Sequence, residues 1–202
     1  MSSSVKETPS FHILIASGGR PSLLQLLNSL KFELNETDAI TIVFDGENAR
    51  AKSTITDEWF IDHKSKITVV EEIPNLGYWG HAIRNKYQSN LTPQTTFVMN
   101  ADDDDVYRPN SFSKLRELCT DENVLYIAKM YVEKFGNKVI PSQAHSITIG
   151  DIGTPCGIIP SKLAGKGSWG YIYGGDYVYY YTLVINTGVK CEFLNEIIYD
   201  VL

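Results

Sequence analysis

Short apolar runs alternate with helix-patterned segments through the first half of this 202-residue chain. Four runs indicate buried strands because they are continuous rather than alternating: residues 11–16, 38–44, 66–71 and 95–101. Each is followed by a segment with a helical pattern: residues 23–30, 49–63, 81–88 and 109–119. This alternation predicts an α/β fold, in which helices flank a mostly parallel, doubly wound, Rossmann-like sheet.

Four consecutive aspartates, Asp102 to Asp105, directly follow the last of these runs. Ligands of open α/β sheets bind beyond the carboxyl ends of the strands, and this cluster would lie there. Adjacent carboxylates repel one another, and a divalent cation bridging to a phosphate relieves that repulsion. Acidic runs are more commonly solvated loops or helix starts. The position after a buried strand favours a metal site here.

Composition limits the class of protein. Hydrophobic residues make up 43% and charged residues 21%, as in an ordinary globular domain. A net charge of −6 disfavours nucleic acid as a partner. The three cysteines, Cys119, Cys156 and Cys191, form no C-x-x-C pair, which argues against a zinc site or a disulfide framework. With no signal peptide and no apolar stretch long enough to span a bilayer, we predict a cytoplasmic protein, in the host cytoplasm if the chain is viral.

The second half of the chain lacks the regular alternation of strand and helix patterns. Residues 124–132, 145–149 and 189–193 look like strands, and residues 174–185 like an aromatic helix. We expect a smaller mixed sheet here, a loose tail over residues 1–10, and one domain over residues 11–202. The last residues have the pattern of a structural element, so we expect further domains to follow in a longer protein.

Two loops at the predicted strand ends carry candidate ligand residues. After the first strand, Ser17 and Gly18 begin a glycine turn that ends in Arg20, where the backbone could approach a ligand closely. A tight strand-to-helix turn explains the same residues equally well. After the second strand, Asp45 could accept a hydrogen bond from a nucleobase or a ribose, although it could also be a turn former or a helix cap.

A third loop, residues 75–85, combines glycines, aromatics and a cation. Asn75 and Gly77 begin it, and the planar guanidinium of Arg84 suits a phosphate. The alternative is a packed loop with Trp79 in the core and Arg84 in solvent. The preceding strand directs this loop to the same edge of the sheet, which favours a functional loop.

One more carboxylate opens the aromatic helix of the second half. Asp176 follows Gly174 and Gly175, and these small residues leave room beside it. A carboxylate that faces the aspartate run would suit a general base. An N-cap role would explain Asp176 as well.

Taken together, these residues resemble the inverting, family-two type of glycosyltransferase with the GT-A fold. The matching segments, in the family's order, are Ala16–Pro21, Asp45, Asn75 with Gly77, Ala82 with Arg84 and Asn85, Asn100–Asp104 as a D-x-D motif, and Gly174–Asp176. The aspartate run and the Gly174–Tyr177 segment also resemble the N-terminal glycosyltransferase domain of a multidomain chlorovirus protein that builds capsid glycans.

The resemblance implies a single GT-A domain, with a nucleotide-sugar-binding half over residues 11–105 and an acceptor-side half over residues 106–202. It implies a UDP-sugar donor, Mn²⁺ or Mg²⁺ on the diphosphate, and inversion at the anomeric carbon. Carried over by position, the donor contacts would be Ser17, Gly18, Arg20, Asp45, Asn75, Gly77, Arg84, Asp102 and Asp103. The metal ligands would be Asp102 and Asp104, and Asp176 would be the catalytic base.

Two departures from the family pattern remain. The aspartate run leaves the D-x-D register open, since Asp102 with Asp104 and Asp103 with Asp105 both fit. The usual Glu-Asp pair at the base segment is Gly175-Asp176 here.

The resulting prediction is a metal-dependent inverting glycosyltransferase. It would move a hexose or deoxyhexose, glucose or L-rhamnose, from a UDP-sugar to a hydroxyl of a glycan acceptor. The alternatives are a sugar-phosphate nucleotidyltransferase and a non-catalytic nucleotide- or glycan-binding module. A nucleotidyltransferase would normally carry a basic glycine-rich loop with a lysine, for which the Ser17–Arg20 turn is too short.

Overall fold

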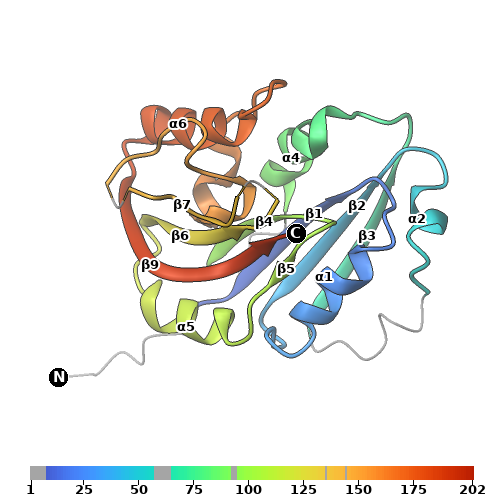
Figure 1. Cartoon of the computed structure of the whole chain (residues 1–202), viewed down its shortest axis with the longest axis horizontal. Coiled ribbons are helices and arrows are strands. Elements are labelled where there is room, and N and C mark those ends of the chain that lie inside the picture. Colours follow the sequence, from blue (N-terminus) through green and yellow to red (C-terminus); the bar gives the residue numbers. More distant parts are fainter. Residues whose placement is uncertain (1–7, 57–64, 92–94, 135, 144) are drawn as a thin grey trace.

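The computed structural model describes residues 8–56, 65–91, 95–134, 136–143 and 145–202. In this part of the chain nine strands form one continuous sheet with the order β3-β2-β1-β4-β8-β6-β9-β5, and β7 pairs with β6 (Figure 1). The strands are β1 Phe11–Ser17, β2 Ala39–Asp45, β3 Lys66–Glu72, β4 Phe97–Asp102, β5 Val106–Tyr107, β6 Val124–Val132, β7 Lys138–Ile140, β8 Gly157–Pro160 and β9 Lys190–Val201.

The sheet is parallel in its first half and mixed in its second. Strands β3, β2, β1 and β4 are all parallel neighbours. Strand β8 is antiparallel to both β4 and β6, and β9 is parallel to β6 but antiparallel to β5. The structure thus confirms the predicted α/β fold, with a mostly parallel sheet flanked by helices.

Helices cover both faces of the sheet. Figure 1 shows α4 and α6 above it and α1 and α5 below it, with α2 beside β3. Their bounds are α1 Leu23–Leu30, α2 Ala49–Lys52, α4 His81–Tyr87, α5 Ser111–Leu118 and α6 Gly175–Thr187. None of the helices in the described residues is long and apolar enough to cross a bilayer.

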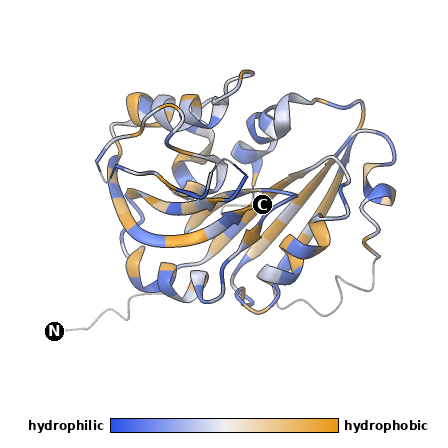
Figure 2. Ribbon diagram, viewed as in Figure 1, coloured by the Kyte–Doolittle hydropathy of each residue, from blue (hydrophilic) through white to orange (hydrophobic). Residues whose placement is uncertain are grey.

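Burial explains why the first strand and helix form as predicted. All seven residues of β1 are buried, as a central parallel strand with both faces covered requires. Helix α1 buries Leu23, Leu26, Leu27 and Leu30, which lie on one face at helical spacing. Figure 2 shows the hydrophobic colour concentrated along the central strands.

Strand register brings three sequence motifs to one edge of the sheet. Ala16 of β1 lies opposite Asp102 of β4, and Ser17 of β1 lies opposite Phe44 of β2, the residue before Asp45. Because the strands are parallel, their carboxyl ends coincide, and the loops that follow β1, β2 and β4 meet there.

Some predicted elements are wrong. The strand predicted over residues 145–149 does not form. Strand β8 was not predicted because its four-residue run is stabilised by pairing with distant β4 and β6. The helix predicted over residues 49–63 ends at Lys52, and residues 57–64 lie outside the described part, as do residues 1–7 of the predicted tail.

Candidate active site

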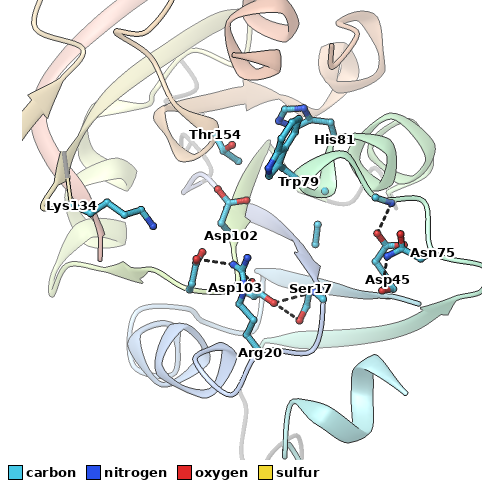
Figure 3. Close-up of a pocket in the computed structure, with 15 residues that line it drawn as sticks. Ser17, Arg20, Asp45, Asn75, Trp79, His81, Asp102, Asp103, Lys134 and Thr154 are labelled. Atoms are coloured by element: carbon cyan, nitrogen blue, oxygen red, sulfur yellow. Dashed lines mark hydrogen bonds and ion pairs between the residues drawn. The ribbon is translucent and has the colours of Figure 1, made fainter. Parts of the chain in front are cut away.

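A cavity of about 610 Å³ opens at the edge where these strands end (Figure 3). This volume lies within the range of small-molecule sites. The residues that line it are Ala16, Ser17, Gly18, Arg20, Asp45, Asn75, Gly77, Trp79, Gly80, His81, Asp102, Asp103, Asp104, Lys134 and Thr154. The cavity therefore brings together all the predicted donor and metal residues except Arg84.

Asp103 ties the loop after β1 to the end of β4. Its carboxylate accepts hydrogen bonds from Ser17 Oγ at 2.7 Å, from the Gly18 N–H at 3.1 Å and from Arg20 at 3.1 Å. Gly19 completes the turn at φ +87°, and a Cβ there would lie 2.2 Å from the Ala49 carbonyl oxygen. Burial raises the pKa of Asp103, while the Ser17 bond and the Arg20 charge oppose the rise. This carboxylate shapes the loop.

Asp45 fixes the loop after β3 in a similar way. Its two carboxylate oxygens accept the N–H groups of Leu76 at 2.7 Å and Gly77 at 2.8 Å. Asn75 donates its side-chain amide to the Asp45 carbonyl at 3.1 Å, and Figure 3 shows both side chains at one end of the cavity. Each carboxylate oxygen keeps lone-pair capacity for a ligand donor.

Arg84, unlike the other predicted donor contacts, does not line the cavity. Its side chain is 0% exposed, and it donates to Asp102 Oδ1 and to the backbone carbonyls of Ala101 and Trp79. Its guanidinium also lies 5.1 Å from the centre of the Trp169 ring. Arg84 thus orients Asp102 from within the protein interior.

Trp79 is exposed, and not in the core as the packed-loop alternative would require. It is 68% exposed and lines the cavity. The chain turns here through two consecutive residues with positive φ, Tyr78 at 55° and Trp79 at 53°. Gly80 follows at φ +79°, where a Cβ would lie 2.6 Å from that of Ala16. This turn directs Trp79 outward and leaves room for Arg84 to lie inward.

The aspartate run divides into two partly exposed and two buried side chains. Asp103 and Asp105 are each 3% exposed. Asp105 accepts the Leu202 N–H at 3.2 Å, and burial, together with the charges of Asp102 and Asp104, raises its pKa to about 7. The side chains of Asp102 and Asp104 are each 33% exposed and line the cavity. These two have the access that a metal ion would need.

The environment of Asp102 and Asp104 fits a hard cation whose remaining ligands come from a bound substrate and water. Among the described residues no three His, Cys, Asp or Glu side chains are grouped as a complete metal cage. Mg²⁺ commonly takes only one or two carboxylates and completes its shell with water and substrate phosphates. Arg84 occupies Asp102 Oδ1, and no described group bonds Oδ2, while Asp104 forms an ion pair with Arg20 at 2.7 Å.

The far wall contains residues that the sequence did not single out. Lys134 follows β6, and Figure 3 shows its side chain extending toward the aspartates. Thr154 comes from a short turn before β8, Thr154–Cys156, and is nearly buried. Lys134 comes two residues after the predicted strand 124–132, and Thr154 belongs to no predicted element. Both lie in the second half of the chain, where no local signal indicates that they reach this edge of the sheet.

His81 forms the upper wall and is held in one orientation. Its Nδ1 lies 2.7 Å from the Gly170 carbonyl oxygen, which can only accept, so we assign the proton to Nδ1. Burial and the nearby charge of Arg84 lower the pKa of His81, which keeps the ring neutral. The ring stacks on Trp169 with centroids 5.5 Å apart and packs against Gly175, where a Cβ would lie 2.5 Å from it.

Asp176 lies in the first turn of α6 and does not line the cavity. Gly174 occupies the cap position, so Asp176 is not the N-cap residue. Burial, followed by the charge of Asp102, raises the pKa of Asp176 to about 6, and the hydrogen bond from the Tyr177 N–H opposes the rise. A carboxylate with such a pKa can accept a proton near neutral pH.

Known structures share this fold. No protein-family model matches the chain, and no curated protein matches it in sequence. The structure of S. aureus TarS 1-349 is similar over 95% of this chain, with a TM-score of 0.67 and 17% identity, and TarS 1-349 has also been solved in complex with UDP-GlcNAc. The mannosyltransferase PcManGT from Pyrobaculum calidifontis, in complex with GDP-Man and Mn²⁺, is similar over 96% of this chain, with a TM-score of 0.68 and 12% identity.

The chain spans only part of these proteins, 60% of TarS 1-349 and 57% of PcManGT. HddC from Yersinia pseudotuberculosis is similar over 92% of its own length, with a lower TM-score of 0.54 and 13% identity. At these identities the likeness shows the fold. The chain has a GT-A-like α/β fold, with its cavity at the carboxyl edge of the sheet.

Proposed function

We propose that this chain is a metal-dependent inverting glycosyltransferase that uses a UDP-sugar. One observation carries the proposal: two accessible carboxylates, Asp102 and Asp104, line a cavity of about 610 Å³ beneath a helix whose first turn holds a carboxylate with a raised pKa. The support from similar structures is that one of them holds UDP-GlcNAc and another GDP-Man with Mn²⁺.

The proposed reaction assigns each group a role. Arg20 and Asp45 contact the nucleoside end of the donor, and Asp102 and Asp104 hold the cation. A bound divalent cation would neutralise the charge that develops on the leaving diphosphate. Asp176 takes the proton of the acceptor hydroxyl, whose oxygen attacks the anomeric carbon from the face opposite UDP. The bond from that carbon to the UDP oxygen breaks, and UDP leaves with the electron pair.

The finer assignments rest on the sequence resemblance. We infer that the sugar is a hexose or deoxyhexose, glucose or L-rhamnose, and that the acceptor is a glycan, as in the chlorovirus capsid-glycan protein that the chain resembles. We also infer a cytoplasmic location, in the host cytoplasm if the chain is viral.

Release of UDP in the absence of an acceptor is the most direct test. Incubated with UDP-glucose or UDP-L-rhamnose and Mn²⁺, the protein is expected to release UDP slowly, because water replaces the acceptor hydroxyl. Pyrophosphate formed from UTP and a sugar phosphate would instead support a nucleotidyltransferase. UDP-sugar binding without turnover, with or without acceptors, would support a binding module.

Removal of one proposed metal ligand should weaken nucleotide binding only when metal is present. We expect Asp104→Asn to lower UDP affinity in Mn²⁺ by at least about tenfold, since a hard cation depends on the charge of its few carboxylates. With EDTA the variant and the parent should bind UDP alike. Calorimetric titration of UDP measures both, and Glu36→Gln, which removes an exposed carboxylate before β2, is the control. Equal affinities in Mn²⁺ would contradict the assignment of Asp104.

A further inference from the structure

Exposed aromatic and aliphatic side chains gather beside the mouth of the cavity. They come from the turn before α4 and from the loop before α6, which lie close together above the sheet in Figure 1. The large exposed hydrophobic residues of these two segments are Tyr78, Trp79, Tyr171, Ile172 and Tyr173. We call these five residues the aromatic platform. None of them carries a charge, and contiguous exposed apolar surface of this kind commonly marks a binding site.

The platform is held in place from beneath. Tyr78 and Tyr171 stack with ring centroids 4.5 Å apart and an interplanar angle of 18°. The two loops are joined beside this stack by the bond between His81 Nδ1 and the Gly170 carbonyl. Asn85 and Trp169 exchange two more hydrogen bonds, at 2.8 and 2.9 Å. The rings are therefore presented by ordered backbone.

The conformation of Tyr78 and Trp79 is unfavourable for the stability of the folded protein in two ways. Tyr78 and Trp79 both have φ near +55°, a left-handed conformation that bulky residues rarely adopt. Tyr78 is also 52% exposed and Trp79 is 68% exposed, so neither large ring gains the burial that normally stabilises an aromatic residue. Strained backbone of this kind is concentrated at functional sites.

The platform is continuous with the cavity on the side where Asp176 lies. Trp79 lines the cavity itself, and Tyr78 stands between the two lining residues Gly77 and Trp79. Tyr171 belongs to the loop that leads into the first turn of α6 and Asp176. A ligand lying on these rings would therefore reach the cavity near His81, which packs against Gly175, the residue before Asp176.

We propose that the aromatic platform binds the acceptor, and that the acceptor residue it takes is a neutral pyranose. This inference rests on the proposed function. A pyranose has flat faces of C–H groups that suit the faces of aromatic rings, and its hydroxyls point to the sides. The uncharged platform matches a neutral sugar, whereas the carboxylates and basic groups of the cavity suit the cation and diphosphate.

The test compares acceptor use with acceptor-independent UDP release. Methyl pyranosides of glucose, galactose, mannose, xylose, fucose and rhamnose serve as acceptors, with UDP-glucose or UDP-L-rhamnose as donor. We expect Tyr171→Ala and Tyr78→Ala to raise the acceptor KM on the order of tenfold, as loss of a ring stack predicts. UDP release without acceptor is measured for each variant as its own reference, so that a change in acceptor KM is separated from a change in donor use. Tyr171→Phe keeps the ring and should keep the parent KM.

Phe32→Ala is the matched control, because Phe32 is 90% exposed and follows α1 on the other side of the sheet. An unchanged acceptor KM in both alanine variants would overturn the proposal, as would a parent protein that glycosylates none of the pyranosides. Equal losses in Tyr171→Phe and Tyr171→Ala would also overturn it, because the hydroxyl and not the ring face would then bind.

Failure of the proposed function has a separate signature. It would appear as no UDP release from either donor, with or without acceptor. Binding of the same methyl pyranosides, observed by saturation-transfer NMR, needs no turnover and tests the platform in that case. Signals that keep the parent intensity in Phe32→Ala and weaken in Tyr171→Ala support the platform, and signals that are absent from the parent or unchanged in Tyr171→Ala overturn it.

Discussion

Asp176→Asn is expected to abolish sugar transfer while making the protein more stable at neutral pH. Loss of a general base typically lowers the rate by about 10²–10⁴-fold, and the isosteric amide cannot take the acceptor proton. UDP affinity in Mn²⁺ should remain that of the parent, because Asp176 does not line the cavity. Initial rates of transfer and calorimetric titration of UDP measure the two effects.

The gain in stability follows from the sign of the pKa shift. The pKa of Asp176 is raised from 3.8 to about 6, so the folded protein holds this proton more tightly than the unfolded chain does. The charged carboxylate therefore destabilises the fold increasingly from about pH 4 to pH 6 and fully above that. A shift of about two units corresponds to at most about 3 kcal/mol. Loss of a favourable charge near the start of α6 offsets about 0.3–1 kcal/mol of it.

Denaturant unfolding at two pH values isolates this effect. At pH 8 we expect Asp176→Asn to raise the free energy of unfolding by about 1–2 kcal/mol, and at pH 4 the difference should disappear. In the parent, kcat/KM for transfer should rise with pH and level off above about 6, the pKa of Asp176. A variant that transfers sugar normally, or that is destabilised at pH 8, would assign Asp176 a structural role.

Arg84→Met should destabilise the protein severely. Arg84 is completely buried and satisfies three acceptors, Asp102 Oδ1 and the carbonyls of Ala101 and Trp79. Removing one member of a buried pair typically costs about 3–5 kcal/mol, because its partner is left without compensation. Asp102 retains some contact with water, which places the expectation toward the lower end, about 3 kcal/mol.

The double variant Arg84→Met with Asp102→Asn tests the cause. Neutralising Asp102 should restore part of the lost stability, since the unpaired charge is then gone, and a double-mutant cycle gives the coupling between the two side chains. Lys114→Met, which removes an exposed cation paired with Glu196, should cost less than about 1 kcal/mol. Normal stability with greatly weakened UDP binding would mean that Arg84 contacts the ligand directly, as the sequence suggested.

Much of the fold could be predicted because its strands and helices are local patterns with strong burial. Strand β6 has the predicted bounds, Val124–Val132, and the first four predicted strands all form. The elements that were missed depend on distant partners. Strand β8 is four residues long and owes its conformation to β4 and β6. Strand β9 runs far beyond the predicted residues 189–193 because β6 and β5 pair along it.

The residues of the candidate site likewise divide into those predicted from local sequence and those that depend on distant contacts. Ser17, Asp45 and Asp102 were placed correctly at one edge, because parallel strands end together and each residue closes or follows a strand. Lys134 and Thr154 were missed, since they reach the cavity from the second half of the sheet.

The amino-acid sequence by itself determined which strands are buried and which chemical groups follow them, since both depend on residues close together in the chain. Only the tertiary structure decided which neighbouring side chains face the cavity. The turn at Tyr78 and Trp79 directs the tryptophan outward and leaves Arg84 inside. Asp105 is buried and accepts a hydrogen bond from the N–H of Leu202, which follows β9 and lies far from Asp105 in the chain, whereas Asp102 and Asp104 remain accessible.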